Sequence, residues 1–114
     1  MTHYLISFPS AAMRHVRDEE LPSVSEAAHA VVRAAKAAGV YVFGGGIDER
    51  IAPVLITADG EQVKESAAEP RRLDGGFCVL RVATRAEAEA WAARLAAACR
   101  CPQELRAFMF DPES

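Results

Sequence analysis

The sequence predicts an α+β domain in which two helices lie on one face of a mostly antiparallel sheet. Three observations lead to this fold class: strand and helix patterns alternate, the two helical segments are of similar length, and a two-residue turn joins two short strands. At 114 residues, of which 51% are hydrophobic, the chain is long enough for one domain, residues 1–114, with a core of its own.

The first elements are predicted as a strand, a helix and a second strand. Residues 3–8 alternate between two faces, as in a half-buried strand. The segment Ser-Val-Ser-Glu at 23–26 fits a capping box and predicts that a helix begins there, with Gly39 as its C-terminal cap. Residues 40–43 are rich in β-forming residues and predict a strand that ends at the glycines 44–46.

A hairpin and a loop are predicted next. Residues 52–58 form a third strand pattern, and the Asp-Gly pair at 59–60 predicts a tight turn into residues 61–64. Residues 65–74 show no periodicity and are predicted as a loop.

The last third repeats the strand, helix, strand order. Residues 77–82 form a nearly continuous apolar run, which indicates a strand covered on both faces for most of its length. A second capping box at 84–87 opens a helix that Pro102 ends, and residues 104–110 again alternate as a strand.

This order of elements fits a split βαβ, or ferredoxin-like, sandwich. In such a fold the strand at 77–82 leaves an apolar sheet face that a single chain has no helix to cover. We therefore expect a homodimer in which two copies pack through this sheet face.

Composition argues against several classes of partner. Thirteen lysines and arginines are scattered among sixteen acidic residues, and no basic run exceeds two residues, so nucleic-acid binding is not expected. No stretch reaches the ~18 apolar residues of a membrane span, and the N-terminus lacks a signal-peptide pattern, so we expect no membrane association and a cytoplasmic location. The three cysteines are expected to be reduced thiols.

Several segments occur in a recognisable order: a helix ending in AAG, the strand VYVFGGGI, a DG hairpin, EPRRLDGGF, and a helix ATRAEAEAWAARL. This order resembles the YCII-related domain family, especially its DGPF-type branch, from Tyr4 to Phe110. The resemblance implies a dimeric α+β barrel of ferredoxin-like subunits with a pocket between sheet and helices. Around residues 64–68, where that branch carries Asp-Gly-Pro-Phe, this chain has Lys-Glu-Ser-Ala-Ala, so no role of that aspartate transfers.

The resemblance also implies an acid–base pair, for which His29 and Asp48 are the nearest counterparts. His29 lies about one position from the family's histidine, a displacement of about 100° around the helix. By periodicity His29 falls on the polar stripe with Glu26, Arg33 and Lys36. A solvent-exposed histidine is therefore the competing interpretation, because proton transfer requires the ring to face the pocket.

Three further residues are candidates for ligand binding. His15 follows the first strand between Arg14 and Arg17, a setting suited to an anionic ligand. Arg50 follows the glycines and is a candidate for the mouth of the expected pocket. For both His15 and Arg50, a solvated loop or turn residue is the alternative. Tyr41 is a candidate for the pocket lining, with packing in the core as the alternative.

The glycines at 44–46 do not fit a phosphate-binding fingerprint, because another strand follows them where a helix would be required. We interpret them as a place where the strand bends or bulges and a dimer mate or a ligand comes close. Cys99 and Cys101 supply two thiols where structural zinc requires about four ligands, so no metal or other cofactor is expected.

The predicted function is binding of a small organic molecule, with lyase-type or isomerase-type acid–base chemistry. The alternative is a non-catalytic binding or regulatory module that has lost the family's site.

Overall fold

The computed structural model describes residues 1–64 and 73–114. Its elements, in chain order, are β1 (Thr2–Phe8), η1 (Ser10–Met13), η2 (Asp18–Glu20), α1 (Leu21–Ala37), β2 (Tyr41–Gly46), β3 (Val54–Ile56), β4 (Gln62–Lys64), β5 (Gly76–Val82), α2 (Arg85–Cys99) and β6 (Glu104–Ala107).

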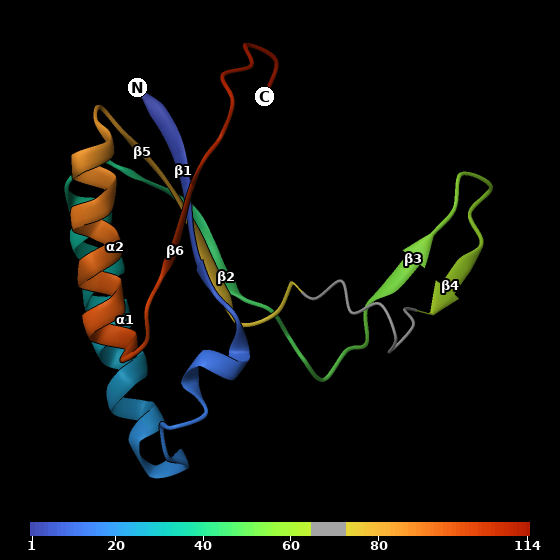
Figure 1. The fold of residues 1–114 in the computed structure, drawn as a ribbon, viewed down its shortest axis with the longest axis horizontal. Helices are drawn as coiled ribbons and strands as arrows, with labels where there is room; N and C mark the ends of the chain where they lie inside the picture. The colour runs from blue at the N-terminus through green and yellow to red at the C-terminus, as the bar shows by residue number, and fades with distance from the viewer. Residues whose placement is uncertain (65–72) are drawn as a thin grey trace.

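Four of the strands form one antiparallel sheet in the order β2-β5-β1-β6, and both α-helices cover the same face of it (Figure 1). Within residues 1–64 and 73–114, the strands β3 and β4 pair only with each other. The predicted α+β class, with an antiparallel sheet and two helices on one face, is confirmed.

The predicted start of α1 is wrong by two residues. The helix begins at Leu21, and Glu20 at its N-cap makes no capping hydrogen bond through its side chain. Pro22 fits into the first turn because the backbone N–H that proline lacks has no acceptor there. Ser23 therefore lies inside the helix. At the other end the prediction is confirmed, since Gly39 adopts the left-handed backbone, with φ +75°, that ends many helices.

The predicted start of α2 is confirmed. The Thr84 hydroxyl accepts a hydrogen bond from the Glu87 amide at 3.2 Å, and the Glu87 carboxylate reaches back to the Ala83 amide at 3.3 Å. The helix ends at Arg100, whose φ of 58° places a non-glycine residue in the left-handed region. The helix thus stops two residues before Pro102.

The prediction that the second strand ends at the glycines is also wrong. β2 continues through Gly44, Gly45 and Gly46, which pair in register with Cys78, Phe77 and Gly76 of β5. The irregularity in this ladder lies earlier, between Tyr41 and Phe43. The bulge therefore precedes the glycines, which are ordinary paired strand residues.

The core lies between the helices and the sheet. It consists of residues from both layers that are less than a tenth exposed: Tyr4, Ile6, Ala35, Cys78, Leu80, Val82, Ala88 and Leu95. On the opposite face, apolar side chains of the three strands β1, β2 and β5 form what we call the outer sheet face: Leu5, Phe43, Phe77 and Val79. Phe43 is 61% exposed there, with its ring centroid 6.2 Å from that of Phe77.

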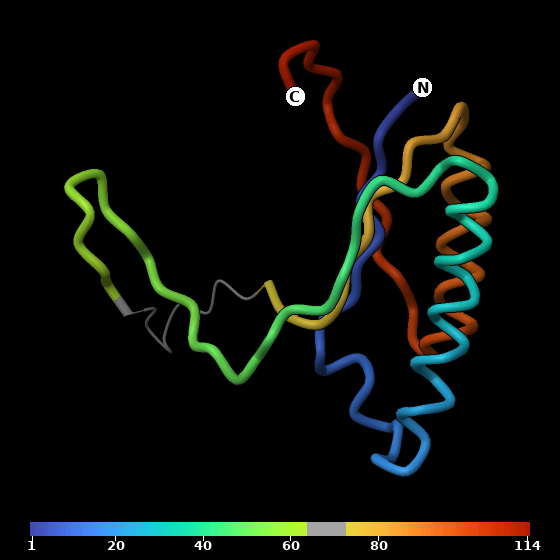
Figure 2. Tube along the Cα trace, turned by 180° about the vertical axis from the view of Figure 1, so that it is seen from behind, coloured from blue at the N-terminus to red at the C-terminus, as the bar shows by residue number. Residues whose placement is uncertain are grey.

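The hairpin of β3 and β4 extends away from the main sheet as an arm (Figures 1 and 2). The hairpin lies where it was predicted, but its loop has three residues, 58–60, and not the predicted two. The Thr57 amide donates to the Glu61 carbonyl at 2.9 Å, the Gly60 amide donates to the Thr57 carbonyl at 2.9 Å, and Gly60 has φ +87°. The radius of gyration is 15.9 Å, against about 13 Å expected for a compact chain of this length. The arm exposes apolar side chains, including Ile56 at 66%.

Several predicted boundaries change. β3 is shorter than the predicted strand at 52–58, and β6 ends at Ala107 where a strand to residue 110 was expected. Most of the predicted loop at 65–74, and most of the Lys-Glu-Ser-Ala-Ala segment, lies outside the described residues. Within residues 1–64 and 73–114, no helix combines the length and apolar character needed to cross a membrane.

Candidate functional site

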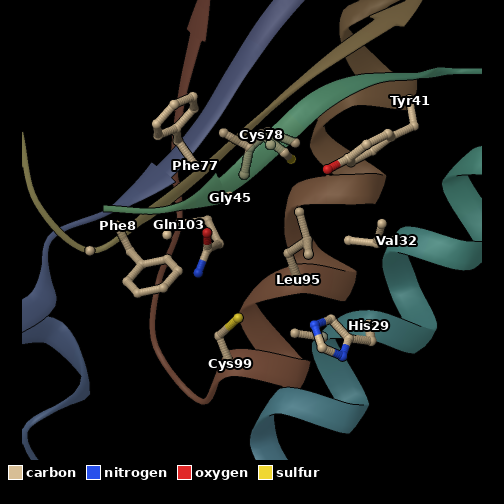
Figure 3. A pocket seen from close by; sticks show the side chains of 16 residues that line it. Phe8, His29, Val32, Tyr41, Gly45, Phe77, Cys78, Leu95, Cys99 and Gln103 are labelled. Atoms are coloured by element: carbon tan, nitrogen blue, oxygen red, sulfur yellow. The ribbon is translucent and has the colours of Figure 1, made fainter. Parts of the chain in front are cut away.

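A cavity of about 350 Å³ lies between the glycine-rich end of the sheet and the two helices (Figure 3). This volume is near the lower end of the range for small-molecule sites, roughly 300 to 1,000 Å³. The described residues that line it are Ile6, Phe8, Ala28, His29, Val32, Tyr41, Gly44, Gly45, Gly46, Gly75, Gly76, Phe77, Cys78, Leu95, Cys99 and Gln103.

The sheet wall of the cavity is mostly backbone. Phe8, Gly76 and Gly46 stand in one cross-strand row over β1, β5 and β2. The entry to β5 is fixed by Asp74, whose carboxylate accepts hydrogen bonds from the Ser10 amide and hydroxyl, both at 3.1 Å. This contact ties the segment that follows β1 to the segment that leads into β5, beside Phe8 and Gly76.

The helix wall is formed by α1 and α2. Val32, Leu95 and Cys99 project from the two helices toward the sheet (Figure 3). His29 is exposed, as its polar stripe predicted, yet its ring also lines the cavity. Positions three apart lie on the same side of a helix, so His29 shares the direction of Val32. The cavity opens along this edge of α1, and His29 is therefore both exposed to solvent and part of the lining.

Polar groups reach the cavity at a few points: the His29 imidazole, the Tyr41 hydroxyl, the Gln103 amide and the Cys99 thiol. Burial, with the nearby Cys78, raises the pKa of Tyr41, and burial, with Cys101, raises the pKa of Cys99. The phenol and the thiol are therefore neutral at pH 7. Imidazole is the side chain suited to proton transfer near neutral pH, which leaves His29 as the acid–base candidate of the lining.

Asp48, the predicted partner of His29, is not among the described residues that line the cavity. Its carboxylate instead accepts hydrogen bonds from Arg50, from the backbone N and from Nε and Nη2 of the side chain, each at 3.0 Å. These bonds lower the pKa of Asp48 and raise the pKa of Arg50. Within the described hydrogen bonds, none joins Asp48 to His29, so the proposed acid–base pair stays a prediction.

The three predicted ligand residues take different positions. Tyr41 lines the cavity, with the Lys36 ammonium 5.4 Å from its ring centroid. Arg50 is 90% exposed at its side chain and is engaged by Asp48. His15 Nε2 lies 2.7 Å from the Arg100 carbonyl oxygen, next to the Glu20–Arg100 ion pair. His15 therefore joins the loop after β1 to the end of α2.

Other lining residues have no counterpart among the predicted sites. Phe8 at the end of β1 is far in sequence from Leu95 of α2 and from Gln103 in the connection between α2 and β6, and only the tertiary packing brings them together. One sequence signal was available: the pair Gly75-Gly76 before an apolar strand, of which Gly76 pairs in the structure with Gly46 of β2.

Comparison with models of known protein families gives no match, and no curated protein is similar to this chain in sequence. Among the residues that the structure describes, no group of three or more histidine, cysteine or acidic side chains is placed to hold a metal ion.

Proposed function

We propose that this chain is a YCII-related protein that binds a small organic molecule in the cavity between its sheet and helices. The observation that carries the proposal is the cavity itself: about 350 Å³, mostly apolar in its described lining, with a few polar groups from separate elements. Small-molecule sites typically combine such an apolar lining with a few polar groups that orient the ligand.

The strand order supports a ferredoxin-like assignment. In a split βαβ unit, the strand of the other half inserts between the two strands that a helix connects. Here β5 lies between β1 and β2, which α1 connects, and β6 lies on the far side of β1. The order β2-β5-β1-β6 is the one expected of two interlocked halves of this kind.

For a catalytic version of the function, His29 is the group that would accept or donate a proton. Its ring borders the cavity and, in the described part of the chain, makes no hydrogen bond to another side chain. The alternative, a non-catalytic binding module, is favoured by a specific observation. Asp48 accepts hydrogen bonds from Arg50, and none of the described hydrogen bonds joins it to His29.

The test is a ligand screen by thermal shift, since a compound that binds only the folded state raises the melting temperature. Hits are then incubated with the protein and followed by NMR for chemical change. Conversion that the His29→Gln variant loses while still binding supports catalysis. Binding without chemical conversion of the ligand supports the non-catalytic binding module. A screen of several hundred compounds without any stabilisation would contradict the proposal.

The homodimer is part of the same proposal. The outer sheet face presents Phe43 at 61% exposure beside the half-buried Leu5, Phe77 and Val79. Exposed contiguous apolar surface of this kind marks association sites. The β3–β4 arm is a two-stranded hairpin with exposed apolar residues, and an isolated hairpin is only marginally stable in water. A second copy would cover both surfaces.

A further inference from the structure

The three glycines of β2 occupy chemically different positions. At Gly44, the protein itself explains the absence of a side chain: an added Cβ would stand 2.6 Å from Cβ of Cys78 and 2.7 Å from the Phe77 carbonyl oxygen. Such distances are far inside van der Waals contact, which for carbon pairs is roughly 3.5 to 4.0 Å. Gly44 is required by internal packing.

Gly46 has no such explanation. The nearest atom to an added Cβ is the Gly75 carbonyl oxygen at 3.6 Å, an ordinary contact distance. Gly46 is also not among the glycines with positive φ, so an L-residue is compatible with its backbone. A glycine within a strand weakens it by roughly 0.5 to 1 kcal/mol relative to alanine. Nothing in the described chain requires glycine at this position.

The register shows where a side chain at Gly46 would point. Side chains alternate between the two faces along a strand, and paired residues share a face. Gly46 pairs with Gly76, and Gly76 pairs with Phe8, whose ring stands toward the cavity in Figure 3. Gly45 pairs with Phe77 and therefore faces the outer side. A side chain at position 46 would fill the cavity, and one at position 45 would leave it open.

We propose that Gly46 is a specificity-determining residue, and that its bare backbone is the surface on which a planar, uncharged ring of the ligand lies. This inference rests on the proposed function, since it names the class of molecule that the same cavity takes. The ring would approach the peptide plane closely because no Cβ stands in the way. Its opposite face would contact the aliphatic side chains Val32 and Leu95 of the helix wall.

The neighbouring residues support a ring as the ligand group. The Phe8 ring leans over Gly76, where an added Cβ would lie 2.9 Å from its Cε1. Neighbouring strands are about 4.8 Å apart. Because the Phe8 ring stands over Gly76, a ligand ring over Gly46 on the next strand would lie within the roughly 4.5 to 7 Å that separates ring centroids in aromatic pairs. Gln103 and His29 at the rim supply hydrogen bonds to one hydroxyl or carbonyl group.

The test uses three matched probes: 2-naphthol, which is planar and uncharged, its saturated counterpart decahydro-2-naphthol, and the charged 2-naphthoate. Titrations are followed by ¹H–¹⁵N NMR of the full chain. We expect 2-naphthol to shift the Gly46 and Gly76 amides and to bind at least tenfold more tightly than either other probe. Equal binding of decahydro-2-naphthol would overturn the planar-ring inference.

Variants at Gly46 and at a residue outside the cavity lining locate the effect. Gly46→Ala is expected to fold, because its Cβ meets no atom closer than 3.6 Å, and to weaken 2-naphthol binding at least tenfold, with Gly46→Val weaker still. Ser23→Ala, at an exposed position of α1 that is absent from the described lining, is the control and should bind as the wild type does. Unchanged binding by folded Gly46→Ala would overturn the inference while leaving the proposed function intact. No binding by the wild type of any probe or of any compound in the thermal-shift screen would overturn both.

Discussion

The hydroxyl of Tyr41 lies directly beside Gly44: an added Cβ on this glycine would stand 2.8 Å from the phenol oxygen. The two residues belong to the same strand, and the irregularity between Tyr41 and Phe43 brings Tyr41 and Gly44 to the same side of the sheet. The absence of a side chain at Gly44 therefore allows the Tyr41 hydroxyl to lie against the strand and border the cavity.

Replacing Gly44 with alanine should destabilise the protein, because the new Cβ overlaps Cys78, the Phe77 backbone and the Tyr41 hydroxyl. Overpacking of this kind costs about 1 to 3 kcal/mol. The measurement is the free energy of unfolding from urea denaturation. The control is Gly45→Ala, whose Cβ meets no atom within 4 Å and should leave stability unchanged or slightly increased. Equal stabilities of the two variants would contradict the packing argument.

The two predicted capping boxes, which begin at Ser23 and at Thr84, should differ in how much their first residue contributes to the free energy of unfolding. Thr84→Ala removes the acceptor of the Glu87 amide at the start of α2 and is expected to cost about 1 kcal/mol. Ser23→Ala alters an exposed residue inside α1 and should change stability by less than about 0.5 kcal/mol. Thermal or urea unfolding of both variants checks this. A larger loss for Ser23→Ala would mean that α1 begins at the predicted residue after all.

Alkaline pH should destabilise the protein through Cys78. Burial, with a smaller contribution from Cys99, raises the pKa of the Cys78 thiol to about 11. An unfolded thiol has a pKa of about 8.5, so between these values the folded state binds more protons than the unfolded state. The stabilising contribution is fully present below about pH 8.5 and is lost as pH rises through the folded-state pKa.

The measurement is urea unfolding at several pH values from 8 to 11 for the wild type and Cys78→Ala. The wild type should lose more stability over this interval, by about 1.4 kcal/mol for each unit of pKa difference. Tyr41 and the other thiols titrate in both proteins, so the difference between the two curves reports Cys78 together with its coupling to Tyr41 and Cys99. Parallel curves would show that the Cys78 thiol titrates normally in the folded protein.

If two copies pack through the outer sheet face, a charge introduced on that face should weaken the dimer. Phe43→Glu places a carboxylate on the most exposed aromatic position of that face and should weaken self-association at least tenfold, or by about 1.4 kcal/mol. Sedimentation velocity at micromolar concentrations measures the change. Ala93→Glu, on the exposed side of α2, is the control and should remain dimeric. A monomeric wild type, or equal dissociation of both variants, would contradict the proposed interface.

Local patterns predicted most elements because their signals depend on near neighbours. The alternation of residues 3–8, Gly39 and the Thr84 cap all act within a few residues, and the structure confirms each. The Asp59-Gly60 pair likewise predicted the place of the hairpin, although its loop is one residue longer than expected. The start of α1 was missed for a similar local reason. A serine three residues before a glutamate fits a cap, but the preceding 3-10 turn at Asp18–Glu20 allows the helix to begin earlier.

The candidate site was predicted less completely, because its parts are distant in sequence. Periodicity placed His29 on a polar stripe, and the residue is indeed exposed. Whether that stripe also borders a cavity depends on how α1 sits against the sheet. Phe8 and Gln103 were missed for the same reason, since neither carries a signal until β1 and the end of α2 are packed together.

The sequence by itself determined the α+β class, the succession of strands and helices and most of their ends, because hydrophobic periodicity and turn chemistry are short-range. Tertiary structure alone decided the meaning of the glycines at 44–46. Pairing with β5 made all three of them strand residues. Internal packing requires glycine at position 44 alone among the three. Strand alternation directs a side chain at position 46 toward the cavity and one at position 45 away from it. Those outcomes depend on register, which is a property of two strands and not of either one.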